Sequence, residues 1–268
     1  MSAERPELAA EMQRRSRSFD AWAFDYDRYR PTYPAAMFDH ISNRLGLGPN
    51  PLVADLGAGT GKAARAMARR GWNVIALEPG EGMLDVLRAR TEAEGLPIEA
   101  HLAPAEATGL DDSAVDLVTV AQAFHWFDKP RAVDEMARIT RPGGGVAIFW
   151  NVRDDDRSAF LAAYTELTGR FLPEEHVDRR VRESSAPAEL SSGGWFTVDD
   201  RVEISHQVSM SHDDFIGLAF TASQVRLFVD GPSQRRLMGE LRDLLAEYFG
   251  ESNVVVPYDV DVYVGRRT

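Results

Sequence analysis

The residues best suited to chemistry lie in a short glycine-rich segment. Residues 52–62 read Leu-Val-Ala-Asp-Leu-Gly-Ala-Gly-Thr-Gly-Lys, an apolar run that reaches Asp55 and continues into glycines at 57, 59 and 61. Glycine permits positive φ and close approach of backbone to a ligand, and a following helix N-terminus offers free N–H groups. A second apolar run, residues 74–77, ends on Glu78, whose carboxylate could accept hydrogen bonds from ribose hydroxyls. The glycine-rich segment and Glu78 together predict a site for a nucleoside-containing cofactor.

The glycine spacing separates the possible cofactors. A dinucleotide site typically reads Gly-x-Gly-x-x-Gly, whereas here glycines stand at 57, 59 and 61 behind an acidic residue. The carboxylate of Asp55 would repel a pyrophosphate but suits a cationic ligand with an amino-acid tail. The chain has no Gly-x-x-x-x-Gly-Lys-Ser/Thr sequence, which excludes a nucleotide P-loop. The pattern favours S-adenosylmethionine, and an NAD-dependent dehydrogenase is the weaker alternative.

Further motifs follow in order along roughly the first 150 residues. They are Tyr26-Asp27-Arg28-Tyr29-Arg30-Pro31, the glycine loop, residues 77–84, Ala105-Glu106, residues 115–118, Ala121-Gln122-Ala123-Phe124-His125-Trp126-Phe127 and Arg141-Pro142-Gly143-Gly144. With these motifs in register, the chain resembles the class I S-adenosylmethionine-dependent methyltransferases. Within that class it is most similar to the small-molecule branch of trans-aconitate methyltransferase-like proteins. The resemblance implies S-adenosylmethionine as methyl donor and S-adenosylhomocysteine as its product.

The resemblance also implies a role for each motif. Asp55 would accept a hydrogen bond from the cofactor's ammonium, and Glu78 would hold the ribose hydroxyls. The other implied cofactor contacts are Gly57, Ala58, Gly59 and Gly61 in the loop, Pro79 and Met83 on the adenine, Ala105 and Glu106 at its polar edge, Ala121 and Gln122 beside the methionine part, and Tyr26, Tyr29 and Arg30 as a lid, with Arg30 pairing the cofactor carboxylate. On residue type alone, Arg30 could be a surface arginine, Met83 helix core and Glu106 a solvated loop charge. Because both acids are expected on loops, Asp55→Ala and Glu78→Ala should abolish cofactor binding and leave the fold intact.

His125 is the candidate catalytic residue. It is the only histidine at a predicted strand end on the cofactor side, so it could act as general base or simply position groups. A carboxylate acceptor would need no base, whereas an amine, phenol or carbon acid would. No histidine spacing fits a metal site, and Asp154-Asp155-Asp156 is interpreted as a solvated helix start, so no metal is predicted. The acceptor is expected to be a small molecule, with a carboxylic acid as first guess, near Trp150, Asn151, Arg153, Phe220 and Arg226.

Composition limits the class of protein further. The chain has 268 residues, of which 44% are hydrophobic, and no composition shift marks two independent domains. A net charge of −12 and a pI near 5.0 oppose attraction to nucleic acid or anionic lipid. The chain has no cysteine, no apolar leader and no apolar run long enough to span a membrane. We therefore expect a cytoplasmic protein with a small-molecule partner, no nucleic acid partner and no membrane association.

Apolar runs alternate with helix-period stretches, which predicts an α/β fold with a parallel sheet between helices. Strands are expected at 52–56, 73–78, 98–103, 115–121, 145–150, 196–208 and 254–264. Helices are expected at 61–70, 80–94, 129–140 with Gly143 to Gly145 as its stop, two or three within 154–190 broken at Pro173 and Pro187, and then 212–220 and 232–249.

The resemblance implies a Rossmann-like seven-stranded sheet of order 3-2-1-4-5-7-6 with strand 7 antiparallel. Four regions follow: an N-terminal lid and first helix (1–40), an S-adenosylmethionine-binding core (41–150), a helical insertion that caps the acceptor (151–194) and the final strands and helices (195–268). A non-catalytic S-adenosylmethionine-binding regulatory protein is the main functional alternative. It would bind the cofactor tightly without turnover.

Overall fold

A central sheet organises the chain. The computed structural model describes residues 22–173, 185–199 and 201–268. The parallel strands are β1 (Leu52–Leu56), β2 (Asn73–Glu78), β3 (Ile98–Leu102), β4 (Val115–Ala121) and β5 (Thr140–Arg153), and the antiparallel β8 (Val254–Arg267) lies beside β5. The order is β3-β2-β1-β4-β5-β8-β6, with β7 also paired to β8. The predicted Rossmann-like α/β fold and its antiparallel final strand are confirmed.

The edge strand differs from the prediction because it is in two pieces. Residues 196–208 were expected as one strand, but the structure has β6 (Phe196–Val198) and β7 (Val202–Met210), which gives the sheet eight strands. Val198 pairs with Gly265 and Val202 pairs with Val262. Four positions along the edge therefore correspond to three along β8, so the pairing register shifts by one residue between β6 and β7.

Helices cover both faces of the sheet. The helices α3 (Ala35–Leu45), α4 (Lys62–Arg69) and α5 (Glu81–Glu94) bury apolar side chains such as Phe38, Met67 and Leu87 against one face. On the other face, α6 (Lys129–Ile139) and α8 (Ala186–Ser192) pack residues such as Met136 and Leu190. In the part of the chain that the structure describes, no helix is both long and apolar enough to cross a bilayer.

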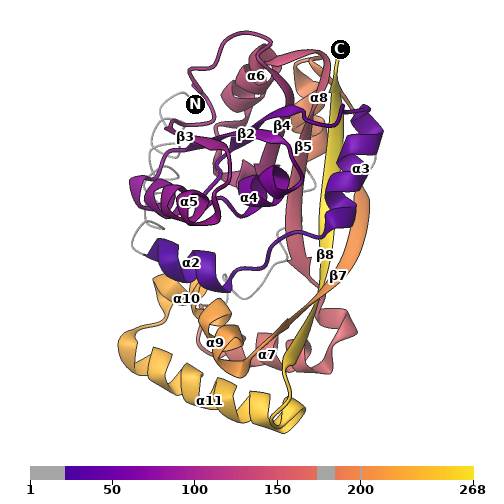
Figure 1. The fold of residues 1–268 in the computed structure, drawn as a ribbon. Coiled ribbons are helices and arrows are strands. Elements are labelled where there is room, and N and C mark those ends of the chain that lie inside the picture. Colours follow the sequence, from indigo (N-terminus) through magenta and orange to yellow (C-terminus); the bar gives the residue numbers. More distant parts are fainter. Residues whose placement is uncertain (1–21, 174–184, 200) are drawn as a thin grey trace, which may run out of the picture.

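A group of helices, here called the cap, lies beyond one end of the sheet (Figure 1). It consists of α7 (Ala159–Gly169), α9 (His212–Phe220), α10 (Ser223–Phe228) and α11 (Gly231–Phe249), which share one hydrophobic cluster. β8 runs through both parts: Val254, Val256 and Tyr258 belong to the cap cluster, while Val260, Val262 and Val264 belong to the core cluster. The cap thus consists of residues from the predicted insertion (151–194) and from the segment that follows β7.

Three local expectations were wrong. α6 ends at Ile139 and β5 begins at Thr140, so the glycines at 143–145 lie within the strand instead of stopping the helix. A Cβ at Gly145 would lie 2.5 Å from Leu45 Cδ2, so glycine is needed there for packing. Pro187 occupies the first turn of α8, where a missing N–H costs no helical hydrogen bond. The short helix α10 was not expected.

Candidate functional site

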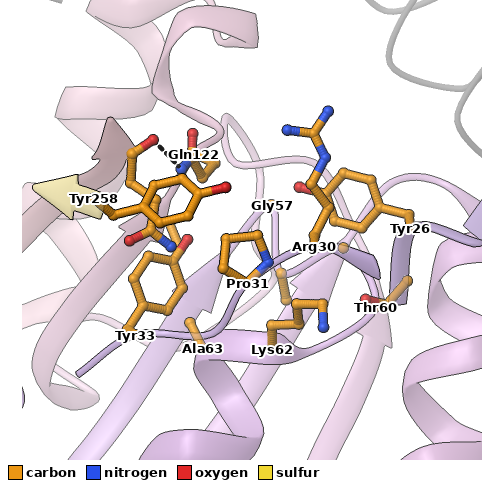
Figure 2. Close-up of a pocket in the computed structure, with 14 residues that line it drawn as sticks. Tyr26, Arg30, Pro31, Tyr33, Gly57, Thr60, Lys62, Ala63, Gln122 and Tyr258 are labelled. Atoms are coloured by element: carbon orange, nitrogen blue, oxygen red, sulfur yellow. Dashed lines mark hydrogen bonds between the residues drawn. The ribbon is translucent and has the colours of Figure 1, made fainter. Parts of the chain in front are cut away.

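Three adjoining cavities lie at the carboxyl ends of the central strands. The loop cavity, of about 580 Å³, is lined by the glycine loop, Lys62 and Tyr33 (Figure 2). The strand-end cavity, of about 780 Å³, is lined by Glu78 and Phe127 among others, and the cap cavity, of about 1380 Å³, reaches the cap helices. Tyr26 and Gln122 line all three cavities. Ligands in open α/β sheets bind at this edge, so the cavities are the candidate site.

The glycine loop shapes the first two cavities. Gly57, Gly59 and Gly61 have φ of +64°, +56° and +82°, which L side chains rarely adopt. A Cβ at Gly57 would lie 2.7 Å from the Cβ of Ala123, whereas one at Gly59 would meet nothing within 4 Å. Gly57 therefore permits close packing and Gly59 leaves space for a ligand. Gly61 lines none of the three cavities, because it faces Leu87 of α5, whose Cγ would be 2.8 Å from an added Cβ.

Glu78 joins the loop to the end of β2. Its Oε2 accepts a hydrogen bond from Gly59 N at 2.8 Å, and its Oε1 accepts one from Gly80 N at 2.9 Å. A carboxylate has about four acceptor positions and can accept from several donors at once. The predicted contacts Pro79, Met83, Ala105 and Glu106 line the strand-end cavity with it. Sequence reasoning missed the bond from Glu78 to the loop, which joins residues 19 apart in the chain.

Asp55 lies deeper than the sequence predicted. It belongs to β1, its exposed fraction is 0%, and it lines none of the three cavities. Its Oδ1 accepts a hydrogen bond from Thr119 Oγ1 at 2.7 Å. Burial raises the pKa of Asp55 to about 7, although the hydrogen bond from Thr119 acts in the opposite direction. The expectation that both acids lie on loops was therefore wrong, because Asp55 lies within β1 and Glu78 is the last residue of β2, and replacement of Asp55 by alanine would disturb the core.

The raised pKa of Asp55 makes a testable prediction about stability. A carboxyl group whose pKa is higher in the folded state than the usual 3.8 stabilises the fold fully below pH 3.8, and this contribution is lost as the pH rises through 7. Between pH 5 and pH 8 it should fall by about 3 kcal/mol. Urea unfolding of the wild type and of Asp55→Asn at both pH values measures the difference. An identical pH dependence in the two proteins would show that Asp55 is ionised normally.

The helix α2 (Ala23–Tyr29) lies between the core and the cap (Figure 1). Tyr26 and Arg30 line the cavities as predicted, but Tyr29 does not, because its ring packs against Gly217 of α9. Toward the core, the buried carboxylate of Asp27 accepts hydrogen bonds from Arg65 Nη2 at 2.6 Å and from Arg90 Nε at 2.7 Å. Asp27 lies within the motif that the sequence singled out, yet its partners were not predicted. It fixes α2 over the site.

Gln122 has a strained backbone at the junction of the three cavities. Its φ is +60°, which is uncommon for a residue other than glycine and costs about 1 kcal/mol or more. Its N donates to Phe149 O at 3.0 Å, and its side-chain amide donates to Asn151 O at 3.2 Å. Such strain concentrates at functional sites, where surrounding contacts hold it in place. Ala121, also predicted, lines the loop and strand-end cavities.

His125 lines the cap cavity from the short 3₁₀ turn η2 (Phe124–Trp126). Burial, with a smaller effect of Lys129, lowers the pKa of His125 to about 4. The ring is therefore neutral at pH 7 and only a weak base. Its Nδ1 is buried and has no hydrogen-bond partner among residues that the structure places.

The charged side chains that line the cap cavity are cations, set among neutral polar and apolar groups. Arg30 and Arg153 line it, and no aspartate or glutamate does within the described ranges, although the chain has 42 acidic and 30 basic residues. Arg153 donates to Asp155 Oδ1 at 2.6 Å and lies 4.8 Å from the centroid of the Tyr164 ring. Asp155 is thus an ion-pair partner and not merely part of a solvated helix start. An anionic ligand would be favoured in this cavity.

The predicted acceptor contacts divide into two groups. Trp150, Asn151 and Arg153 line the cap cavity. Phe220 and Arg226 do not, since Arg226 donates to the carbonyl of Phe220 and to Asp25. Residues that sequence reasoning missed come from the cap helices, among them Tyr164, Thr165, Thr168, Gln224 and Val225.

Comparison with known proteins finds relatives for the part of the chain that contains the central parallel strands. Residues 54–148 match the methyltransferase domain family. An uncharacterised methyltransferase of Mycobacterium tuberculosis is 43% identical over 156 residues, which are 58% of this chain and 60% of that protein. A malonyl-[acyl-carrier protein] O-methyltransferase of Pectobacterium atrosepticum is 37% identical over 132 residues, which are 47% of this chain and 50% of that protein. The chain thus spans about half to 60% of the length of these relatives.

The overall fold also has a counterpart among solved structures. A protein of Anaeromyxobacter dehalogenans, provisionally named as a type II methyltransferase, superposes with a TM-score of 0.65. The two are 25% identical, and the match covers 89% of this chain and 98% of the other.

Proposed function

This chain carries a class I S-adenosylmethionine-dependent methyltransferase domain, the class that its motifs predicted, and we propose that it methylates a small-molecule acceptor. The observation that carries the proposal is the meeting of three cavities at Tyr26 and Gln122. The strand-end cavity would take the adenosine, the loop cavity the amino-acid tail and the cap cavity the acceptor. The trans-aconitate methyltransferase-like branch stays a prediction.

The residues present fit S-adenosylmethionine. Gly59 leaves open space where a side chain would intrude, and the Thr60 hydroxyl is buried without a hydrogen-bond partner among the residues described. Glu78 would accept from the ribose hydroxyls, with Met83 and Pro79 against the adenine. When bound, the cofactor supplies a sulfonium methyl that bonds to the acceptor as the carbon–sulfur bond breaks and its electrons stay on sulfur. The protein's own contribution is to position the acceptor and exclude water.

For the acceptor, we propose a small carboxylic acid methylated on oxygen. Support comes from the two arginines that line the cap cavity and from its lack of lining acids within the described residues. One relative is named as an O-methyltransferase, which agrees with an oxygen nucleophile. A carboxylate already carries the attacking electron pair, so no proton has to be removed. The absence of nucleic acid and membrane partners and a cytoplasmic location remain predictions.

Calorimetric titration with S-adenosylmethionine and S-adenosylhomocysteine tests the donor site, followed by assays with labelled methyl donor and a panel of small carboxylic acids. We expect micromolar binding and turnover with an acid. Tight binding without turnover on broad acceptor panels would favour the regulatory alternative. No heat from either ligand, in a protein shown to be folded, would argue against the donor site, and a nicotinamide cofactor would be titrated next.

The pH dependence of the reaction can distinguish whether His125 acts as a general base or only positions other groups. With a carboxylate acceptor, His125→Gln should lower kcat by less than about 10-fold, since loss of a true general base typically costs 10²-fold or more. The pH dependence of kcat/KM should show no step near pH 6.5, because the ring stays neutral down to about pH 4. A loss of about 100-fold together with the disappearance of a pH step would instead assign His125 as the general base.

A further inference from the structure

We infer that Lys62, together with the hydroxyl of Thr60, binds the carboxylate of the cofactor's amino-acid tail, and that Arg30 does not. The inference rests on the proposed function, because it concerns the ligand of the loop cavity. It changes the assignment that the sequence motifs implied, in which Arg30 pairs with that carboxylate.

Lys62 has the placement that such a role needs. It is the first residue of α4, directly after the glycine loop, and it lines the loop cavity but neither of the other two. Figure 2 shows its side chain at this cavity, beneath Pro31 in the view. Within the described residues, Lys62 forms no hydrogen bond or ion pair. Its ammonium is therefore available to a ligand.

Thr60 provides a second, independent observation. Its exposed fraction is 1%, it lines the same cavity, and its Oγ1 has no hydrogen-bond partner in the part of the chain described. A buried hydroxyl without a partner is costly, so a ligand atom is its natural complement. Thr60 and Lys62 lie two positions apart, on either side of Gly61. A carboxylate could accept from both at once.

The charges around Lys62 favour an anion. Arg30, Arg65 and Arg90 act on its ammonium, and the one opposing carboxylate among these neighbours is Asp27, which already accepts hydrogen bonds from Arg65 and Arg90. Burial first, and then the three arginines, lower the pKa of Lys62 to about 8 in spite of Asp27. A positive charge that is costly in the free protein gains most from a bound negative charge.

One end of the Arg30 guanidinium is held by the cap. Its Nη2 donates to the carbonyl oxygen of Thr221 in the cap at 2.8 Å, and its guanidinium carbon lies 5.5 Å from the centroid of the Tyr26 ring. In Figure 2 the guanidinium points away from Lys62. Arg30 lines both the loop cavity and the cap cavity, and its Nε is buried without a hydrogen-bond partner among the described residues, so the assignment between Lys62 and Arg30 has to be decided by experiment.

The test compares two ligands that differ only in the carboxylate: S-adenosylhomocysteine and its decarboxylated analogue, which keeps the aminopropyl chain. Calorimetry gives their affinities for the wild type, Lys62→Gln and Arg30→Gln. We expect the wild type to prefer S-adenosylhomocysteine by about 10- to 100-fold, as for a charge-assisted hydrogen bond. Lys62→Gln should lose that preference while binding the analogue as before, and Arg30→Gln should keep it. Lys62→Arg, which retains the charge, should keep most of it.

Three outcomes would overturn the assignment. Lys62→Gln could keep the wild-type preference, Arg30→Gln could lose it, or the folded wild type could bind both ligands equally. A wild type that binds neither ligand would overturn the proposed function itself, so the two failures are distinguishable. Thermal melts of each variant verify folding.

Discussion

Glu78→Ala is expected to weaken binding of S-adenosylhomocysteine by at least about 100-fold. The substitution removes the acceptor proposed for the ribose hydroxyls. It also leaves the partly buried N–H of Gly59 and the buried N–H of Gly80 without their partner, and an unsatisfied buried group costs about 1–3 kcal/mol. Loop and ligand are thus affected together, which makes this substitution the most damaging for cofactor binding. Calorimetric titration measures the loss directly.

Glu81→Ala is the matched control for Glu78→Ala. Glu81 lies three positions further along, is exposed and begins α5, so its removal should change the affinity by less than about 3-fold. Glu78→Gln, which keeps one acceptor oxygen, should give an intermediate affinity. Wild-type affinity in Glu78→Ala would refute the assignment of this acid to the cofactor. A melting temperature lowered in Glu78→Ala and unchanged in Glu81→Ala would confirm that Glu78 also holds the loop.

Asp27→Ala should lower the free energy of unfolding by about 3 kcal/mol, because the buried guanidinium of Arg65 loses its nearest carboxylate and keeps only Glu94, at 3.4 Å. Arg90 loses its partner as well, although its side chain is more exposed. Since Asp27 holds α2, and α2 carries Tyr26, affinity for S-adenosylhomocysteine should fall in the same variant. Urea unfolding followed by tryptophan fluorescence measures the first effect and calorimetry the second.

Asp25→Ala is the control on the same helix. Asp25 pairs with Arg226 at 3.0 Å, but its side chain is 53% exposed. Exposed pairs contribute about 0–1 kcal/mol, so Asp25→Ala should be nearly neutral. If both substitutions cost the same, the loss in Asp27→Ala would reflect α2 as a whole and not its buried ion pairs.

The core of the fold could be predicted from the sequence because buried parallel strands are continuous apolar runs. β1, β2 and β4 begin and end where their runs predicted, at 52–56, 73–78 and 115–121. The edge strand could not be predicted equally well. Its interruption depends on pairing with residues of β8 that lie 60 to 67 positions later in the chain, and local alternation contains no sign of the shift in register.

The candidate site could likewise be predicted where it depends on local pattern and not where it depends on contacts between distant residues. Glu78 and Gln122 reach the cavities because each lies at the end of a parallel strand, which a sequence can indicate. Asp55 was misplaced because its position within the strand directs the side chain into the core, where Thr119 binds it. The link from Asp27 to Arg65 and Arg90 joins positions 38 and 63 residues apart, so no local pattern predicts it.

The continuity of β8 has a mechanical consequence. Because one strand supplies side chains to the hydrophobic clusters of both cap and core, the cap cannot swing on flexible connections without bending that strand. Opening of the site is therefore expected to involve α2. An engineer who wishes to change the acceptor would accordingly exchange individual side chains of the cap cavity, since grafting a foreign cap would require cutting through the sheet.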